Sequence, residues 1–174
     1  MKHSNTFLLM LLTILIAREP QYIFDLEITG NNQLESSQLK SKIRLKSRSF
    51  FSKTEFNQKK LHLDEITLKN YYQTMGYIDA SVTSTYEVFQ DTDVNLTFIV
   101  NEGSQYFIKD INYDGIKLFE DHEVKEIINL AKDEVYNPVK LQRNLKLLKY
   151  EYLMRGKLNI SIVEDIVLEG DRAV

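Results

Sequence analysis

An internal repeat limits what this chain can fold into more than any other feature of its sequence. Gly30 and Gly115 lie 85 positions apart (115 − 30), and the same offset aligns apolar residues on both sides of each glycine. Further along, Gly76 and Gly156 lie 80 positions apart (156 − 76), so the first copy carries five extra residues between its two glycines. Because a repeat of this length is one supersecondary unit, the sequence predicts two similar small domains in tandem.

Alternation of apolar and polar residues predicts the strands of both copies. In the first copy, strands are expected at Tyr22–Ile28, Ser81–Phe89 and Val94–Val100. In the second copy, strands are expected at Tyr106–Tyr113 and Leu158–Ile166. The side chains of the first strand that we expect to face the core are Tyr22, Phe24, Leu26 and Ile28.

Apolar residues at helical spacing predict two helices in each copy. They are expected at residues 36–43 and 58–74 in the first copy, and at 122–130 and 139–155 in the second. Each copy is therefore predicted to be a β-α-α-β-β unit of the α+β class, in which two helices cover one face of a mixed three-stranded sheet. The junction at residues 101–104 is too short to act as a free linker, so the two units should touch.

Residues 1–17 have the pattern of a secretory signal peptide. A basic start is followed by an apolar run at Phe7–Ala17, which is shorter than the about 20 residues needed to cross a bilayer. A buried core helix is the alternative, but the run opens the chain and shows no amphipathic period. We therefore expect residues 1–17 to direct export.

Composition and charge exclude several classes of function. The chain has no cysteine, which excludes a disulfide framework and thiolate metal sites. Its net charge of −3 comes from acids and bases mixed along the chain, unlike the clustered basic face of a nucleic-acid-binding protein. Acids lie beside histidines at His62–Glu65 and Asp121–Glu123, but metal ligands and catalytic triads must converge from fixed spacings. No catalytic, metal or cofactor residue is therefore predicted.

Several short motifs occur in an order that resembles the POTRA family. The first copy has I-x-G-N at 28–31, L-x-x-Y-Y-x-x-x-G-Y at 68–77 and V-x-E-G at 100–103. The second copy departs from this pattern at Ile116 and Lys157. The chain is similar to the tandem POTRA domains of the outer-membrane protein assembly factor BamA family. The structural motif residues of that resemblance are Gly30, Asn31, Tyr72, Gly76, Tyr77, Glu102, Gly103, Gly115 and Gly156.

The resemblance implies a periplasmic module of an outer-membrane protein assembly factor. It implies unfolded outer-membrane proteins and accessory assembly lipoproteins as partners, a position at the periplasmic face of the outer membrane, and no enzyme, cofactor or nucleic acid. In such a domain the second strand lies at the edge of the sheet, where an extended peptide can add as a further strand. The residues of that candidate edge are Ser81, Val82, Thr83, Ser84, Thr85, Tyr86, Glu87, Val88 and Phe89. A merely solvated edge strand is the alternative.

The second copy is expected to be incomplete. An offset of 80 maps Val94–Val100 onto positions that begin at 174, and the resemblance makes this third strand the central one. We therefore expect one complete domain at 22–103 and a second at 104–174 that lacks its third strand, with a hairpin turn at 169–172. Either the chain is a fragment of a longer protein with an outer-membrane barrel, which we favour, or a partner donates the strand. The alternative function is a barrel-less periplasmic adaptor, or a POTRA protein of two-partner secretion or cell division.

A basic and aromatic loop is expected at residues 44–57. Its bases interleave with Phe50 and Phe51, a composition that suits contact with lipid headgroups or with a partner. The interpretation we favour is that both rings tuck under the seam between sheet and helices while the bases stay solvated.

Overall fold

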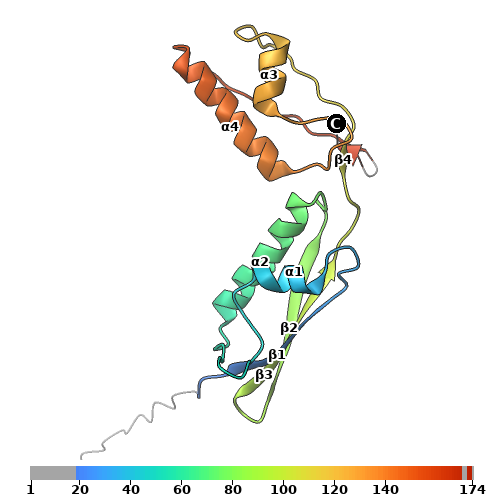
Figure 1. Cartoon of the computed structure of the whole chain (residues 1–174), viewed down its shortest axis with the longest axis vertical. Coiled ribbons are helices and arrows are strands. Elements are labelled where there is room, and N and C mark those ends of the chain that lie inside the picture. Colours follow the sequence, from blue (N-terminus) through green and yellow to red (C-terminus); the bar gives the residue numbers. More distant parts are fainter. Residues whose placement is uncertain (1–18, 170–171, 174) are drawn as a thin grey trace, which may run out of the picture.

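The structure, a computed structural model, describes residues 19–169 and 172–173 of the chain. Two units follow each other along the long axis of the molecule (Figure 1). The segment expected to be a signal peptide, residues 1–17, lies outside the described residues. No helix in the described part of the chain combines the length and the apolar composition that crossing a membrane requires.

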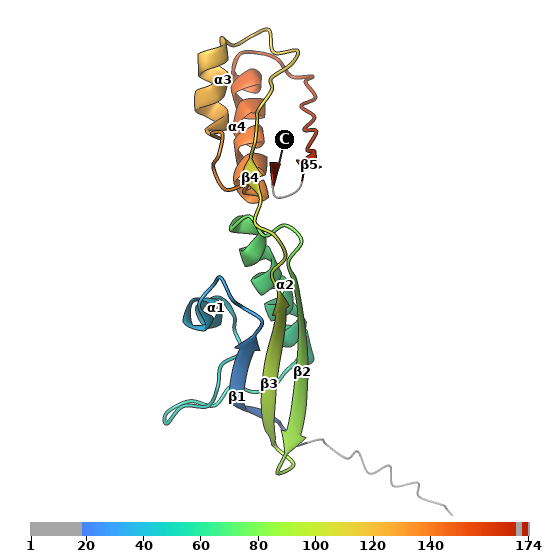
Figure 2. The ribbon, with the colours of Figure 1, turned by 90° about the vertical axis from the view of Figure 1, so that its right-hand side faces the viewer.

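The first unit is a two-layer domain of one sheet and two helices. Its elements are β1 (Tyr22–Thr29), α1 (Ser36–Lys42), α2 (Gln58–Thr74), β2 (Ser81–Phe89) and β3 (Asp93–Asn101). The sheet has the order β1-β3-β2, with β3 parallel to β1 and antiparallel to β2. Both helices pack with the sheet around one core (Figures 1 and 2). The predicted β-α-α-β-β unit is thereby confirmed.

The core of this unit is built around its central strand. β3 alternates strictly, and its four inward side chains are buried as predicted, namely Val94, Leu96, Phe98 and Val100. They pack against buried side chains from the two helices, among them Leu39, Leu68 and Tyr72. Burying an apolar side chain of this size contributes about 1.5–3 kcal/mol, so this layer stabilises the domain.

The first strand does not keep the predicted alternation. A bulge between Ile23 and Asp25 shifts the register of β1 against β3. Ile23 is therefore fully buried, whereas Phe24, which was expected to face the core, is 42% exposed and packs edge-on against Phe89. Leu26 and Ile28, beyond the bulge, face the core as predicted.

The second unit repeats the topology of the first with much shorter strands. Its elements are β4 (Phe107–Ile108), α3 (Asp121–Ile128), α4 (Pro138–Met154), β5 (Leu168–Glu169) and β6 (Arg172–Ala173). The sheet order is β4-β6-β5, with β6 parallel to β4 and antiparallel to β5. The central strand of this sheet is again the last in sequence.

Three expectations for the second unit need correction. The strand expected at 106–113 contains only the two residues of β4, and residues 158–166 form no strand because β5 begins at Leu168. The third strand is not wholly missing, because Arg172–Ala173 already occupies the centre of the sheet. A central strand of two residues offers backbone partners to only two residues on each side, so the flanking segments stay irregular. The turn expected at 169–172 includes residues 170–171, which lie outside the described residues.

The two units touch through the chain segment that joins them. The backbone N–H of Tyr106 donates to the carbonyl of Gly76 (2.8 Å), and its hydroxyl donates to Asp79 Oδ2 (2.7 Å). The Gln105 side chain donates to the carbonyl of Met75 (2.9 Å). Ile78 from the first unit packs against the buried cluster of the second. The expectation that the short junction holds the units in contact is confirmed.

Candidate functional site

The predicted binding strand, β2, lies at one edge of the sheet of the first unit (Figure 2). All nine predicted residues are on it, and they pair in unbroken register with β3 from Ser81 opposite Asn101 to Phe89 opposite Asp93. Among the described residues, no backbone hydrogen bond joins β2 to any segment other than β3. Because alternate residues of an edge strand direct their N–H and C=O groups outward, one whole side of β2 is open to pairing.

The opposite edge of the same sheet is partly covered. β1 accepts a hydrogen bond at the Phe24 carbonyl from Arg48 N (3.2 Å), and Ile23 N donates to the Thr54 carbonyl (2.9 Å). Tyr22 also forms a bridge with Glu55. The loop between α1 and α2 therefore occupies backbone groups of β1 that a strand would need. Of the two sheet edges, β2 is the more accessible one.

The two faces of β2 differ in character. The residues opposite the buried side chains of β3 turn toward the helical layer, and here Ser84 donates to Glu65 Oε1 (2.6 Å) on α2. Tyr86 accepts from the Gln58 side chain (3.1 Å) and remains more than a third exposed. Val88 on the same face is also exposed. The other face carries exposed Thr83, Thr85 and Glu87. A half-covered apolar border therefore runs along β2 beside the helical layer.

Gly30, the motif glycine that follows β1, lies directly against the backbone of β3. Gly30 has φ +78°, and a Cβ built on it would lie 2.0 Å from the Val100 carbonyl oxygen. Asn31 then turns the chain toward α1, because its amide donates to the Leu34 carbonyl (2.8 Å) and to Ser36 Oγ (3.0 Å). The I-x-G-N motif thus fixes the turn between β1 and α1.

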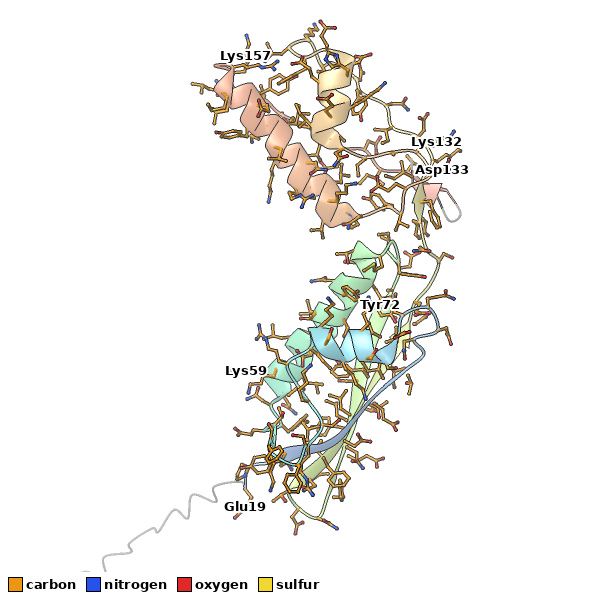
Figure 3. All side chains as sticks on the ribbon, viewed as in Figure 1. Glu19, Lys59, Tyr72, Lys132, Asp133 and Lys157 are labelled. Atoms are coloured by element: carbon orange, nitrogen blue, oxygen red, sulfur yellow. The ribbon has the colours of Figure 1, made fainter. Side chains whose placement is uncertain are left out.

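The remaining motif residues of the first unit meet at the end of β3. The Tyr72 hydroxyl donates to Glu102 Oε1 (3.0 Å), and both carboxylate oxygens accept from Gln33 N (3.0 and 3.2 Å). Tyr72, labelled in Figure 3, is fully buried, and burial and then the Glu102 carboxylate raise its pKa well above the usual range. Tyr77 packs edge-on against Tyr72, and burial raises its pKa too. This cluster ties α2, β3 and the loop before α1 together.

Four motif glycines remain, and they differ in their surroundings. Gly76 has φ +86° and lies against Val135 and Tyr106 of the second unit, where a Cβ would come within 2.7 Å of the valine side chain. Gly103 lies beside Asp79, whereas Gly115 and Gly156 face open space. The paired glycines therefore keep a positive φ in both units, but their surroundings differ between the units.

Sequence reasoning missed a buried polar position that both units share. Asp64, within the His62–Glu65 group, was not predicted to be buried, yet it is buried and its carboxylate accepts from Arg44 N (3.0 Å) and Leu45 N (2.8 Å). Asn144, which lies 80 positions later (144 − 64), is also buried and donates to the Ile128 carbonyl (2.7 Å). In both units a side chain of the second helix therefore hydrogen-bonds to the backbone at or after the end of the first helix. The spacing of Asp64 from Leu61 and Leu68 was the available signal, since it places all three on one helix stripe.

The groups weighed for catalysis have structural roles in this arrangement. His62 Nδ1 lies 3.2 Å from Glu65 Oε2 on an exposed turn of α2. Glu123 closes a capping box with Glu120 and pairs with Arg155 (2.8 Å), and the hydrogen bond from that guanidinium lowers the pKa of its carboxyl. Within residues 19–169 and 172–173, no three histidine, aspartate or glutamate side chains gather as a metal site.

The order of elements, the motif contacts and their repetition coincide with a known family. A family model described as "Surface antigen variable number repeat", or POTRA, matches residues 21–103 and again residues 106–174. The chain belongs to the POTRA family. Each match falls on one of the two structural units, and the resemblance predicted from the sequence motifs is confirmed.

Curated proteins with similar POTRA sequences are outer membrane protein assembly factors. A candidate assembly factor of Treponema pallidum (strain Nichols) is 28% identical over 137 residues, which are 75% of this chain and 16% of the relative. The outer membrane protein assembly factor BamA of Nitratidesulfovibrio vulgaris is 27% identical over 122 residues, 66% of this chain and 15% of the relative. The chain therefore spans less than a fifth of the length of these relatives.

Solved POTRA structures share the fold. POTRA3-5 of Haemophilus influenzae BamA superposes with a TM-score of 0.53 at 17% identity, covering 88% of this chain and 58% of that chain. POTRA1-2 of the periplasmic domain of Omp85 from Anabaena superposes with a TM-score of 0.51 at 16% identity, covering 90% and 94%. At these identities the likeness establishes the mixed α+β fold of a three-stranded sheet and helices.

Proposed function

We propose that the first POTRA domain binds an extended segment of an unfolded outer-membrane protein precursor by strand addition along β2. The observation that carries this proposal is the edge itself, because β2 is paired over its full length on one side and open on the other. Main-chain hydrogen bonds accept many sequences, which suits a module that handles many clients. The half-exposed Tyr86 and Val88 supply a border on which alternate apolar side chains of the segment pack.

The wider setting is also part of the proposal. The relatives described above are outer membrane protein assembly factors, and this chain covers a small share of their length. We place the two domains on the periplasmic side of the outer membrane, after export directed by residues 1–17, with accessory assembly lipoproteins as further partners. Capture and release of a strand form and break no covalent bond, so the module acts without enzymatic chemistry or a cofactor.

A peptide titration tests the binding strand directly. The ¹⁵N-labelled chain is mixed with a synthetic peptide that copies one transmembrane strand of an outer-membrane barrel, with apolar and polar residues alternating. We expect the amide resonances of Ser81–Phe89 to shift and the outward amides of β2 to gain protection from hydrogen exchange. Shifts confined to other elements, or no shifts, would contradict the proposal.

A matched pair of variants separates the edge from the rest of the sheet. Val88 and Ile99 are 41% and 43% exposed, but Val88 lies on the edge strand and Ile99 on the outer face of the central strand. The Val88→Asp change places a charge where the side chains of an added strand would lie. It should weaken peptide binding by about tenfold or more, because that charge would be desolvated. Ile99→Asp should leave the affinity unchanged.

A further inference from the structure

The loop between α1 and α2 carries the most exposed aromatic pair among the described residues. Phe50 and Phe51 are 95% and 93% exposed, and their rings contact each other with centroids 4.8 Å apart. The expectation that both rings tuck under the seam between sheet and helices is therefore wrong. Two adjacent phenylalanines in water are unfavourable, which points to a partner that covers them.

The pair forms the tip of a small, well-braced hairpin. Ser49 N donates to the Ser52 carbonyl (2.9 Å), and Ser52 N to the Ser49 carbonyl (3.4 Å), so the two phenylalanines are the two residues of the turn. Below the tip, both arms are bonded to β1 as described above, and Asp64 fixes the base of the loop. Figure 2 shows this loop projecting from the β1 side of the first unit. The rings are thus presented on a fixed stem.

The segment that carries the hairpin is basic although the chain as a whole is acidic. Residues 40–60 contain eight lysines and arginines against one acid, a formal charge of +7 in a chain of −3. All of these bases except Lys40, which is half-buried, are exposed. Arg48 and Lys53 flank the tip, and each also lies over a ring of β1, at 5.0 Å from the Phe24 centroid and 5.7 Å from the Tyr22 centroid. The apolar tip therefore lies between two basic residues of a basic segment, and one of them, Arg48, also pairs with Asp93 at 3.6 Å.

We propose that this hairpin inserts Phe50 and Phe51 into the surface of a membrane that contains anionic lipids. Aromatic side chains favour the interface between headgroups and acyl chains, and nearby lysines and arginines are attracted to anionic headgroups. The tip is convex, and a fluid interface accepts a projecting tip without a pocket shaped to match it. The charge and the shape of the tip therefore both favour a lipid surface over the groove of a protein.

The hairpin lies near the N-terminal end of the described chain. Gln21 accepts a hydrogen bond from Phe56 N (2.7 Å), so the arm that leaves the tip lies against the start of the described chain. Glu19 lies at the end of the molecule away from the second unit (Figure 3). In the sequence, the apolar run Phe7–Ala17 leads into this end. The hairpin therefore lies beside the segment that the apolar run precedes in the sequence.

Tryptophan fluorescence tests the insertion, because the chain contains no tryptophan of its own. Phe50→Trp puts a single reporter at the tip, and Leu158→Trp puts one at an exposed apolar position of the second unit. Each full-length chain is mixed with vesicles of phosphatidylcholine and phosphatidylglycerol in about a 2:1 ratio, and with phosphatidylcholine alone. We expect a blue shift and quenching by brominated acyl chains for Phe50→Trp with the anionic vesicles, and neither for Leu158→Trp.

Charge variants give an independent measurement. Replacing Lys46 and Lys53 together by glutamine should weaken partitioning onto the anionic vesicles by about fivefold for each charge removed. The matched double change of Lys146 and Lys149 on α4 to glutamine should have no effect. The proposal is overturned if Phe50→Trp shows no blue shift, if both tryptophans respond alike, or if the tip responds only to an added protein and not to lipid.

Discussion

Glu102 joins three segments of the first domain through one buried carboxylate. It follows β3 directly, and its oxygens accept from the Tyr72 hydroxyl on α2 and from Gln33 N before α1. A buried carboxylate is costly unless its lone pairs are bonded, and here two donors from distant parts of the sequence supply those bonds. The V-x-E-G and Y-Y motifs therefore act as one cluster, although about 30 residues separate them.

Removing the Tyr72 hydroxyl should weaken this cluster and change its response to pH. Tyr72→Phe should lower the free energy of unfolding by about 1–2 kcal/mol near neutral pH, because the carboxylate loses one donor. The unfolded tyrosine ionises near pH 10.0, whereas its folded pKa is higher. The stabilisation from the neutral hydroxyl is therefore fully present below pH 10 and is lost as the pH rises above it.

Urea unfolding as a function of pH measures both effects. Above pH 10, the free energy of unfolding of the unmodified chain should fall, and Tyr72 should contribute about 1.4 kcal/mol per pH unit to that slope. Tyr72→Phe should show a correspondingly shallower decline. An equal decline of the free energy of unfolding with pH in both proteins would show that folding does not raise the pKa of Tyr72.

The turn glycine of the first domain allows a test of close backbone approach. Gly30→Ala should destabilise the domain by about 3 kcal/mol or more, because the added Cβ meets the Val100 carbonyl at 2.0 Å and φ is +78°. Gly115→Ala, with φ +69° and nothing within 4 Å, should cost only the about 1 kcal/mol of the backbone conformation. Thermal and urea unfolding of both variants give the comparison, and similar costs would contradict it.

At the scale of elements, the second helix of each unit acts as a brace for the segment that leaves the first helix. Asp64 accepts from the backbone after α1, and Asn144 donates to the last carbonyl of α3. The two side chains use opposite hydrogen-bonding roles at equivalent positions of the repeat. The contact between α1 and α2 therefore depends on a polar bond as well as on apolar packing.

Breaking this brace should loosen the loop without unfolding the domain. Asp64→Ala leaves the amides of Arg44 and Leu45 unpaired and should cost about 2–3 kcal/mol. Hydrogen exchange at Leu45 should accelerate by about tenfold or more, while amides of β3 change only with global stability. Asp64→Asn keeps one carbonyl acceptor and should retain much of the protection. Unchanged exchange at Leu45 in Asp64→Ala would show that the carboxylate is not the brace.

The elements that could be predicted from the sequence are those that bury one face along their whole length, because the spacing of their apolar residues then shows the element directly. β3 alternates because it is buried on one face along its whole length, and the helices follow from apolar spacing. β1 departed from its prediction because an apolar residue stands on each side of the bulge, so alternation alone could not tell Ile23 from Phe24. In the second unit, strands depend on a partner strand, which no local pattern encodes.

In the candidate site, the position of one strand was predicted, whereas the burial or exposure of several side chains was not. The position of β2 at the sheet edge was implied by the family resemblance and is confirmed by the strand order. The buried state of Asp64 was missed because a charged residue on an apolar stripe gives the same local pattern as a helix surface. Exposure of Phe50 and Phe51 was missed because the apolar character of a turn residue does not reveal whether the turn projects or folds back.

At the scale of the whole molecule, the contact between the domains is centred on Gly76. The glycine ends the helical region of the first domain, and its carbonyl accepts from Tyr106 N at the start of the second. A side chain there would meet Val135 at 2.7 Å and the Tyr106 carbonyl at 3.0 Å. The absence of a Cβ thus allows the second domain to lie directly against the first.

Adding one methyl group at this joint should change the relative orientation of the domains. In Gly76→Ala we expect the two domains to need separate alignment tensors in residual dipolar coupling measurements, because the close contact is opened. The unmodified chain should fit one tensor for both domains. Gly156→Ala is the matched control, since it adds a Cβ at the equivalent helix end with nothing within 4 Å. One tensor in all three proteins would show that the joint tolerates the methyl group.

The central place of β3 also determines when the first domain can complete its fold as the chain emerges. β1 comes first in the sequence, but its partner is β3, and the pairing of Tyr22 with Asp93 spans 71 positions (93 − 22). A chain that crosses a membrane from its N-terminus therefore exposes β1, both helices and β2 before the strand that joins them arrives. Until then the sheet has no centre, and closing such a long loop is slow. Under the proposed export, the domain would therefore stay open until its last strand, β3, has crossed.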